Sequence, residues 1–491
     1  MRKLLRYRLF LLFIGFLVFP LVFPATANAY EPSDLLPFVN LTEDTGRGFG
    51  DPMNRYSWSM EEFQGDVFVG TWSAEFNPLK LGDLLTGGGP TGGGVLGFTA
   101  ILDSTGGEIW RYDLDTENWH QVVDAGEEDI GFRSMTKYNG KLFAGTANYT
   151  NGNKILYSAD GESWTPLAGG PTADPLNTSI RTFAVQDGKL FVGTENSTGG
   201  ELWSYSDAGG GSWALENKFS DPAVGELNVF NGKLYAGTWN FDETSFDLFS
   251  MDGPGTFNDI TPVFPGSGSL NNLGVMTLEG FQGQLYLGTV NYLDGFTLLR
   301  ASDPANPSAW EVLSTNGFQN LGPPGSMSNA YVWSMVGLGD ALYLGTFNDG
   351  LYDGVYDPLP IPLDGRGQIW YTKDGVNFLP LVDDGFDQFN YGIRTMVVAD
   401  NRLFAGTASN FFLPSDLDVV QGLLAGLFDK GWISEEHYAL ISGLLAQVGP
   451  LDIGTQVWAS QPAAIPEPAT VFLLGSGLVG LAALRKRRFM K

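Results

Sequence analysis

The chain of 491 residues contains no cysteine and only two histidines, His120 and His437. The lack of cysteine excludes disulfides, thiolate nucleophiles and cysteine-based zinc or iron–sulfur sites. With two histidines, we expect neither a histidine-dependent catalytic triad nor a multi-histidine metal site. Basic residues are also scarce, because 27 Lys and Arg stand against 55 Asp and Glu and the net charge is −28. A surface this acidic repels nucleic acid and anionic membranes, so we expect no nucleic-acid partner.

Glycine and aromatic residues are plentiful, and they favour short strands with tight turns over helices. The chain has 66 glycines, and 13% of its residues are aromatic. One phrase, an apolar strand that ends in Gly-Thr, occurs seven times and ends at Thr71, Thr146, Thr194, Thr238, Thr289, Thr346 and Thr407. Several copies follow a turn dipeptide such as Asn139-Gly140, which is typical of a tight hairpin between two strands.

The repeats predict an all-β fold, a seven-bladed β-propeller over residues 30–460. Each repeat has an inner strand, the Gly-Thr strand and two further strands with aromatic residues, and its length suits a four-stranded propeller blade. The seventh repeat reaches its third strand at Trp458 and lacks a fourth. Residues 34–40 are similar to residues 377–382, the fourth strand of the sixth repeat. We therefore expect the N-terminal segment to complete the last blade and close the ring, which removes open sheet edges.

Two phrases, residues 157–164 and 371–378, resemble the Asp-box turns of sialidase-like propellers, although they lack the residue between Asp and Gly. The whole repeat is similar to a group of secreted bacterial propellers and, loosely, to kelch repeats. Asp-box turns lie away from active sites in such propellers, so the resemblance implies a fold and not an activity.

Two repeats carry insertions between their second and third strands: a Gly-rich stretch at 77–105 and a longer one at 411–452. These repeats have Ser73 and Ser409 where the other five have the asparagine of Gly-Thr-x-Asn. Asparagine tolerates the left-handed backbone conformation of tight turns. Its absence from these two repeats therefore fits the replacement of a tight turn by a longer loop. The second insertion predicts a helical hairpin whose first helix is capped at Ser415. In a closed ring both insertions would crowd one sector of one face.

Residues 1–29 have the pattern of a secretory signal peptide. A basic start precedes an apolar run, and Ala27 and Ala29 form a small-x-small cleavage site for signal peptidase. The alternative is an N-terminal anchor that is not cleaved.

The C-terminal residues 461–491 carry a second targeting pattern. Ile465 and the tripeptide Pro466, Glu467, Pro468 precede an apolar run, 469–484, long enough for a short membrane span. A basic cluster follows and would stay cytoplasmic: Arg485, Lys486, Arg487 and Arg488. This order resembles the PEP-CTERM sorting signal of Gram-negative bacteria that produce exopolysaccharide. The resemblance implies an exosortase that removes the tail. It also implies transient anchoring in the inner membrane, and then residence at the cell surface or in the matrix, in a biofilm for example.

One position of the repeat suggests a binding site, twelve residues before each glycine of Gly-Thr. Its occupants are Trp58, Arg133, Arg181, Gly225, Met276, Trp333 and Arg394. The arginines and tryptophans form a contiguous arc centred on the insertions. The arginines Arg133, Arg181 and Arg394 are candidates for binding a carboxylate or sulfate, with Trp58 and Trp333 as stacking platforms for sugars. The alternative is that each arginine pairs with a local acid and each tryptophan caps the core.

Other candidates carry less information. Two acidic stretches could bind Ca²⁺, but neither has the spacing of an EF-hand loop and no cofactor is predicted: Asp113, Asp115 and Glu117, and Asn348 with Asp349, Asp353 and Asp357. Three acids follow second strands on one face and could supply a glycosidase pair, namely Glu75, Glu195 and Asp242.

The sequence thus favours an exported propeller that binds extracellular polysaccharide. One alternative is a hydrolase or lyase acting on polysaccharide at the same face, and another is a structural matrix protein that self-associates through the helical insertion. An open groove with exposed Trp58 and Trp333 would favour glycan binding, and a dry arc with paired arginines would favour the structural role.

Overall fold

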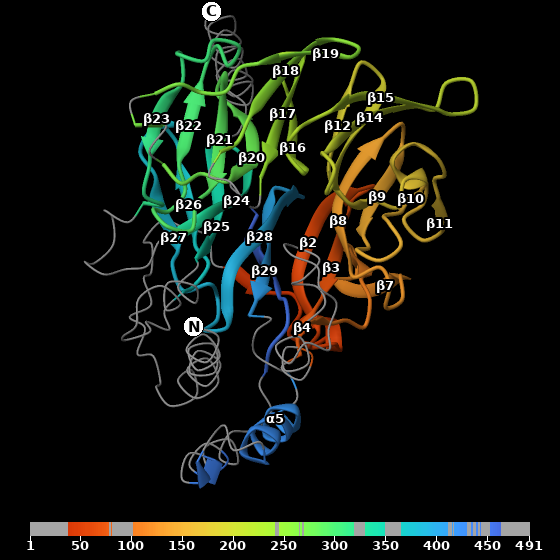
Figure 1. Cartoon of the computed structure of the whole chain (residues 1–491), viewed down its shortest axis with the longest axis vertical. Helices are drawn as coiled ribbons and strands as arrows, with labels where there is room; N and C mark the ends of the chain where they lie inside the picture. Colours follow the sequence, from red (N-terminus) through yellow and green to blue (C-terminus); the bar gives the residue numbers. More distant parts are fainter. Residues whose placement is uncertain are drawn as a thin grey trace, which may run out of the picture.

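A computed structural model describes residues 38–77, 102–240, 245–264, 270–318, 329–348, 365–410, 417–429 and 452–462, with a few single residues between them (Figure 1). The fold is all-β, with one sheet system of 28 strands and a separate two-stranded pair. The predicted signal peptide with Ala27 and Ala29 lies outside the described residues, as does the C-terminal tail with residues 466–468 and 469–488. None of the helices in the described part of the chain has the length and apolar character that a bilayer span requires.

The strands form seven antiparallel groups of four. The first strands are β2 (Asn54–Phe63), β8 (Gly131–Tyr138), β12 (Asn177–Gln186), β16 (Ala223–Phe230), β20 (Gly274–Phe281), β24 (Asn329–Leu338) and β28 (Asn390–Ala399). The second strands, which carry Gly-Thr, are β3 (Asp66–Ser73), β9 (Lys141–Ala147), β13 (Lys189–Asn196), β17 (Lys233–Trp239), β21 (Gln284–Val290), β25 (Ala341–Asn348) and β29 (Arg402–Ser409).

The third and fourth strands lie outside the first two. The third strands are β6 (Glu108–Asp113), β10 (Ile155–Ser158), β14 (Glu201–Ser206), β18 (Leu248–Gly253), β22 (Leu298–Ala301), β26 (Ile369–Thr372) and β30 (Val457–Ser460). The fourth strands are β7 (Asn118–Asp124), β11 (Trp164–Pro166), β15 (Ser212–Lys218), β19 (Thr256–Asp259), β23 (Glu311–Ser314), β27 (Leu379–Val382) and β1 (Phe38–Asn40). Short 3-10 turns follow β1 and β11, namely η1 (Arg47–Gly50) and η2 (Gly170–Ala173).

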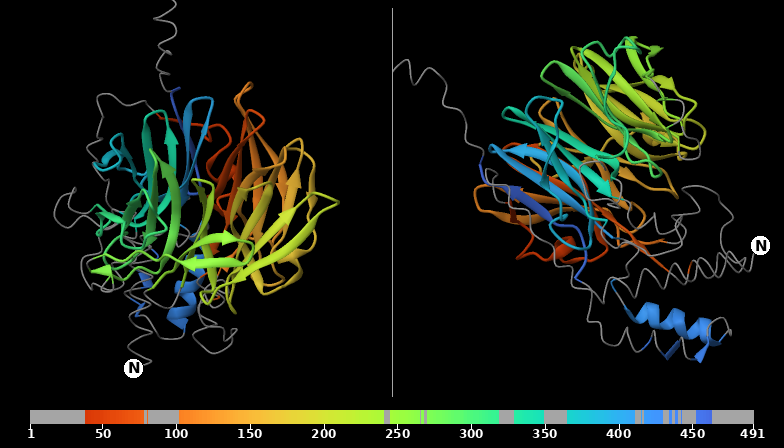
Figure 2. Two further views of the ribbon diagram at one scale, coloured as in Figure 1. Left: turned by 90° about the horizontal axis from the view of Figure 1, so that it is seen from above. Right: turned by 90° about the vertical axis from the view of Figure 1, so that its left-hand side faces the viewer.

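The first and second strands of the seven groups join into a closed ring of 14 antiparallel strands. Each second strand meets the first strand of the next group at one residue pair, for example Trp72 with Gly131 and Val290 with Tyr331. The last second strand, β29, meets β2 through Ala408 and Tyr56, which closes the ring. Figure 2 shows the colours following the sequence around this ring, and in Figure 1 β28 and β29 lie beside β2 and β3.

The glycine of each Gly-Thr allows neighbouring groups to approach closely. A Cβ atom on Gly193 would lie 2.7 Å from Cγ1 of Val224 in the next group, well inside a normal carbon–carbon contact. A Cβ atom on Gly237 or Gly288 would collide in the same way with Val275 or Val332. The glycine of the repeated phrase is therefore a packing requirement between groups.

The threonine and asparagine of Gly-Thr-x-Asn tie the start of each first strand to the end of the second. In the third group, the hydroxyl of Thr194 donates to Oδ1 of Asn177 and accepts from the backbone N–H of Glu201, both at 3.0 Å. The side-chain amide of Asn196 donates to the same Oδ1, and its own Oδ1 accepts from the backbone of Thr198. The asparagine acts through this side chain. None of the five motif asparagines has a positive φ, so the left-handed role expected for it was wrong.

The hairpin turns match the chemistry of their sequences. Asn139 and Asp187 have φ of 47° and 49°, and the glycines after them have φ of 70° and 71°. Two successive residues with positive φ give the tight turn whose twist matches a β-hairpin.

The N-terminal segment completes the seventh group. Phe38, Val39 and Asn40 of β1 pair with Ser460, Ala459 and Trp458 of β30, and this is the closure expected for residues 34–40, within the part described. Farther along, the guanidinium of Arg47 bridges Asp387 at 2.8 Å and Asp452 at 2.9 Å. The first described residues are thereby fastened to the last group by a strand and by two ion pairs.

The two insertions meet on one side of the ring. The short pair β4 (Glu75–Phe76) and β5 (Leu102–Asp103) stands at the base of the first insertion. The backbone N–H of Ser415, in the second, donates to Oε2 of Glu75 at 2.9 Å. Helix α5 (Leu417–Asp429) lies apart from the strands at the bottom of Figure 1. Most of 78–101 and of the second predicted helix lies outside the described residues.

Candidate functional site

The five residues of the predicted arc, and the Gly225 and Met276 that take the same repeat position in the other two groups, all lie at a β-bulge in the first strand of their group. In β2, Ser57 pairs with Thr71 and Ser59 with Gly70, so Trp58 between them is the extra residue. The same shift in register occurs around Arg133, Arg181, Gly225, Met276, Trp333 and Arg394. A bulge bends its strand and redirects a side chain, and bulges are common near active sites.

Aromatic side chains fill the middle of the ring. The rings of Tyr56 and Trp333 are 5.6 Å apart, and those of Trp239 and Tyr331 are 6.1 Å apart. In each pair the two residues belong to groups that are not neighbours, so this cluster spans the ring. Trp58 is 6% exposed and Trp333 is 8% exposed. Neither tryptophan presents an exposed face, contrary to the expectation of stacking platforms in an open groove.

Each arginine of the arc lies over a tryptophan. The guanidinium carbon of Arg133 is 4.8 Å from the ring centre of Trp58, and that of Arg394 is 5.4 Å from the ring centre of Trp333. Arg181 lies over Trp239 at 4.4 Å. Such cation–π contacts hold a guanidinium in place and favour its charged form.

Trp239 was not predicted as part of the site. It directly follows a Gly-Thr, the position that Trp72 and Glu195 take in other groups. This position lies at the end of the second strand, next to the bulges, so the repeat alignment contained the signal.

Two of the three arginines share one carboxylate. Oε2 of Glu195 lies 3.0 Å from Nη1 of Arg181 and 3.9 Å from Nη1 of Arg133. The sequence predicts Glu195 only as a member of a possible catalytic pair, and the structure places it between two arginines. The alternative that the arginines pair with local acids therefore holds for two of them.

Arg394 differs from the other two. Its side chain is buried, at 9% residue exposure, and it makes no ion pair or hydrogen bond with any described residue. Burial lowers the pKa of Arg394 to about 9, helped by the positive charges of Arg133 and Arg181. Burial and the charge of Arg133 lower the pKa of Arg181 to about 10. The three guanidiniums, which we call the arginine cluster, are thus close enough to repel one another.

Two carboxyl groups lie on the neighbouring first strands β16 and β20. Burial raises the pKa of Glu226 to about 7, although Thr182 and the positive charges of Arg394 and Arg181 oppose that rise. Burial and the charge of Glu226 raise the pKa of Glu279 to about 7. The repeat pattern does not single out these groups at the bulge position, because Glu226 occupies the position after it.

The other predicted sites are structural or lie outside the described residues. Oε2 of Glu75 forms an ion pair of 2.6 Å with Arg55, which is fully buried. Oδ1 of Asp113 accepts hydrogen bonds from the backbone N–H groups of Asp115 and Thr116, so this acidic stretch is a hydrogen-bonded turn. Asp242 and residues 349–364 are not described. Over the described ranges, no group of three or more His, Asp or Glu side chains is arranged to hold a metal ion.

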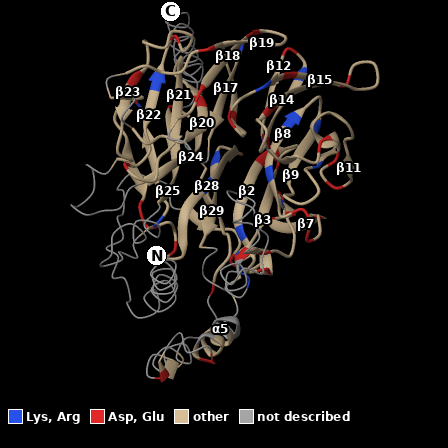
Figure 3. Cartoon of the chain, in the orientation of Figure 1, with Lys and Arg blue, Asp and Glu red and all other residues tan. Residues whose placement is uncertain are grey.

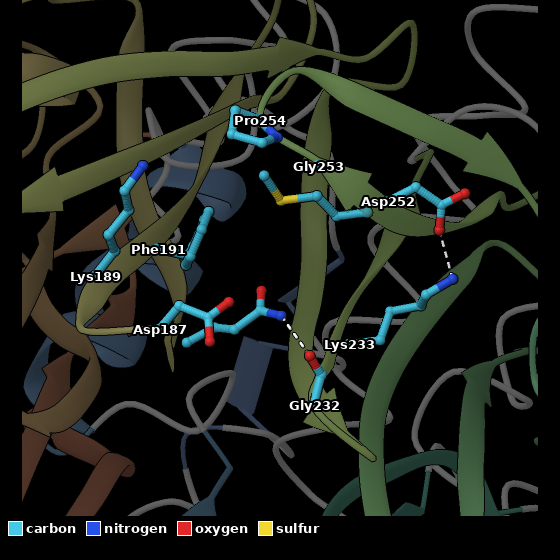
Figure 4. Close-up of a pocket in the computed structure, with 10 residues that line it drawn as sticks. Asp187, Lys189, Phe191, Gly232, Lys233, Asp252, Gly253 and Pro254 are labelled. Carbon is cyan, nitrogen blue, oxygen red and sulfur yellow. Dashed lines mark hydrogen bonds and ion pairs between the residues drawn. The ribbon is translucent and has the colours of Figure 1, made fainter.

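A separate surface hollow of about 410 Å³ lies between the third and fourth groups, on the side of the hairpin turns (Figure 4). Phe191 and Met251 form part of its lining, and Lys189 and Lys233 stand on opposite sides of it. Lys233 is paired with Asp252.

Figure 3 shows acidic residues on many strands and loops, so the convergence of three arginines at one level is a local exception.

The family comparison confirms the resemblance at the C-terminus. Residues 464–488 match the PEP-CTERM protein-sorting motif. This motif marks an exported protein for an exosortase-type sorting enzyme. No curated protein matches the chain.

Solved structures resemble the chain only in fold. A streptogramin B lyase matches at 8% identity and a TM-score of 0.47, over 77% of this chain and 97% of that one. Sqt1 from Saccharomyces cerevisiae matches at 12% identity and a TM-score of 0.42, over 73% of this chain and 81% of that one. A prolyl endopeptidase matches at 12% identity and a TM-score of 0.40, over 72% of this chain but only 46% of that one. The chain has a β-rich repeat fold that resembles these propeller-like structures, and the matches carry nothing about activity.

Proposed function

We propose that this protein is a seven-bladed β-propeller at the cell surface or in the extracellular matrix, and that it binds anionic groups of extracellular polysaccharide at the arginine cluster. The seven groups of four antiparallel strands would be the blades. Signal peptidase and an exosortase-type enzyme would process the two ends, with residues 469–484 holding the chain in the inner membrane in between.

The observation that carries the proposal is Arg394. A buried charge without a partner is strongly unfavourable, and proteins normally pair or neutralise such groups. Arg394 lacks an ion pair in the described structure, and Arg133 and Arg181 add to its electrostatic strain. A carboxylate or sulfate would supply the missing negative charge, and a guanidinium binds either one through parallel hydrogen bonds.

The tryptophans have a different role in this proposal from the one first expected. Trp58 and Trp333 are covered by the guanidiniums of Arg133 and Arg394, so they position the arginines instead of stacking on a sugar. Recognition would then depend on charge and hydrogen bonding, and an uncharged glycan would bind weakly.

A second candidate function is an enzyme acting on acidic polysaccharide. It is favoured by two carboxyl groups whose pKa values lie near 7, Glu226, which feels the charges of Arg394 and Arg181, and Glu279, which feels the charge of Glu226. A group with a pKa near the working pH is suited to proton transfer, and perturbed groups gather at functional sites. Release of reducing ends or unsaturated sugars from an acidic polysaccharide would support this candidate.

The test is the pair of substitutions Arg394→Met and Arg181→Met. If Arg394 is held for a ligand, Arg394→Met removes an unpaired buried charge and keeps the contact with Trp333, so the free energy of unfolding should not fall. Its binding of anionic glycans on an array should be lost. Arg181→Met should lower the free energy of unfolding, by about 3 kcal/mol or more, because it leaves Glu195 buried without its closest partner.

Two controls complete the experiment. The triple variant Arg111→Ala/Arg300→Ala/Arg402→Ala removes three positive charges that lie outside the arginine cluster, two on third strands and one at the start of β29, so it should still bind if the cluster itself is the site. Absence of binding by the parent protein, or unchanged binding by Arg394→Met, would refute the proposal.

A further inference from the structure

The fourth group departs from the other six at two adjacent positions. Its bulge residue is Gly225, where all six other groups have a Trp, Arg or Met side chain. The next residue is Glu226, and in the other groups this position is a Ser or Thr: Ser59, Ser134, Thr182, Thr277, Ser334 and Thr395. A Cβ atom on Gly225 would collide with the carbonyl oxygen of Val275, so the glycine permits the close approach of the fifth group. The glutamate has no such packing explanation.

Glu226 is held by one of its two oxygens. Its Oε1 accepts a hydrogen bond of 2.7 Å from the hydroxyl of Thr182 and one of 3.1 Å from the backbone N–H of Leu227. Its Oε2 has no hydrogen-bond partner among the described residues, and the side chain keeps partial contact with solvent. One oxygen is therefore available to carry a proton.

The charges around Glu226 come from the two neighbouring first strands and from one first strand of a more distant group. Strand β12 contributes Arg181, β28 contributes Arg394, and β20 contributes Glu279. No ion pair joins Glu226 to either arginine within the described structure, yet each arginine favours its charged form. The only described histidine, His120, lies on the outer strand β7, away from this site.

We propose that Glu226 determines when the arginine cluster accepts an anion, because its carboxylate competes with the ligand for Arg394 and Arg181. When Glu226 takes up a proton, the competition ends, and the anion and the proton bind together. This inference rests on the proposed function, since it concerns the same site and the same ligand class.

The sign of the effect follows from electrostatics. A bound anion repels the carboxylate of Glu226 and raises its pKa above the value of about 7 in the free protein. The bound state therefore holds more protons than the free state around neutral pH, and binding tightens as the pH falls. For uptake of one proton the dissociation constant changes by up to about tenfold per pH unit, between the pKa of the free protein and that of the complex.

The experiment uses calorimetric titration of the full chain with two probes, glucuronate and inorganic sulfate, from pH 6 to pH 8.5. Both probes stay ionised over this range, so a pH dependence must come from the protein. We expect tighter binding at pH 6 than at pH 8, and an observed enthalpy that changes between buffers of different ionisation enthalpy because a proton is taken up.

Three variants test the role of Glu226. Glu226→Gln should bind at pH 8 as tightly as the parent does at pH 6, with no pH slope. Thr182→Val removes a hydrogen bond that stabilises the carboxylate, so its pH profile should move to higher pH. Glu311→Gln, on the outer strand β23, is the matched control and should keep the profile of the parent.

The outcomes separate the two proposals. Binding that is lost in Arg394→Met but keeps the parent's pH slope in Glu226→Gln overturns the role of Glu226 and leaves the proposed function standing. Weaker binding by Glu226→Gln at every pH also overturns it, because Glu226 would then contact the ligand directly. No binding of either probe by the parent at any pH overturns the proposed function and this inference with it.

Discussion

The substitution Gly193→Ala tests whether the glycine of Gly-Thr is a packing requirement between neighbouring groups. The added methyl group would lie 2.7 Å from Cγ1 of Val224, 2.8 Å from Cγ2 of Thr182 and 2.9 Å from Cβ of Val224. Carbon atoms normally pack at about 3.5–4.0 Å, so three contacts are each too short by about 1 Å. Val224 is fully buried and its strand is paired on both sides, so it has little room to move.

The expected size follows from two opposing terms. Overpacking of a buried site costs about 1–3 kcal/mol. Replacement of glycine by alanine stiffens the unfolded chain and returns about 0.4–1 kcal/mol, because the backbone at Gly193 lies outside the left-handed region. We therefore expect Gly193→Ala to lower the free energy of unfolding by about 1–2 kcal/mol.

The assay is urea denaturation followed by tryptophan fluorescence, with a double-mutant cycle. Val224→Ala removes the nearest methyl groups, so the double variant Gly193→Ala/Val224→Ala should lose less stability than the two single losses combined, by about 1 kcal/mol. The matched control is Gly337→Ala, a strand glycine whose added methyl would meet only Cδ2 of Phe281, at 3.9 Å. If Gly193→Ala and Gly337→Ala had the same denaturation midpoint, the close-approach argument would be wrong.

Two further predictions concern the ring closure and an Asp-box-like turn. Arg47→Ala removes the ion pairs with Asp387 and Asp452, so it should lower the free energy of unfolding by about 1–3 kcal/mol, and an unchanged urea midpoint would contradict this. Backbone hydrogen bonds from Ser163 and Glu162 lower the pKa of Asp160 to about 2. Because this pKa is depressed, the stability that the carboxylate contributes is present above about pH 4 and is lost as the pH falls through 2. Acid unfolding of Asp160→Asn should therefore be less steep between pH 4 and pH 2, and a curve that matches the parent's would rule this out.

The repeat pattern predicts much of the fold because each group makes the same local contacts. Gly193 leaves room for Val224 of the next group, and the hydroxyl of Thr194 accepts a hydrogen bond from the third strand. The same residue types recur at these positions in each repeat. A position-by-position comparison also singles out the residue twelve before the glycine, which the structure shows to be the unpaired residue of a bulge in all seven groups. The sequence could not show that this residue forms a bulge. All seven repeats have the extra residue at the same position, so no difference in length between repeats reveals it.

Contacts across the ring were beyond the reach of the sequence. Trp333 lies against Tyr56, and Trp239 lies against Tyr331, although the two partners of each pair are far apart along the chain. This packing buries the tryptophans that were expected to be exposed. The sequence does not predict Glu226 as a site residue for a related reason. Its charge interacts with that of Arg394, which belongs to the seventh group, whereas Glu226 belongs to the fourth.

The place of β30 in the seventh group bears on how the protein would respond to a mechanical pull. The sorting motif begins at residue 464, shortly after Ser460 ends this strand. Strand β30 lies between β29 and β1 and pairs with both. A force on the C-terminal tail that is directed along β30 would act nearly perpendicular to the hydrogen bonds on the two sides of this strand. Those bonds would have to yield together in shear instead of opening one after another. While the tail is fixed in a membrane, the ring is thus held at the point where its first and last strands lock each other in place.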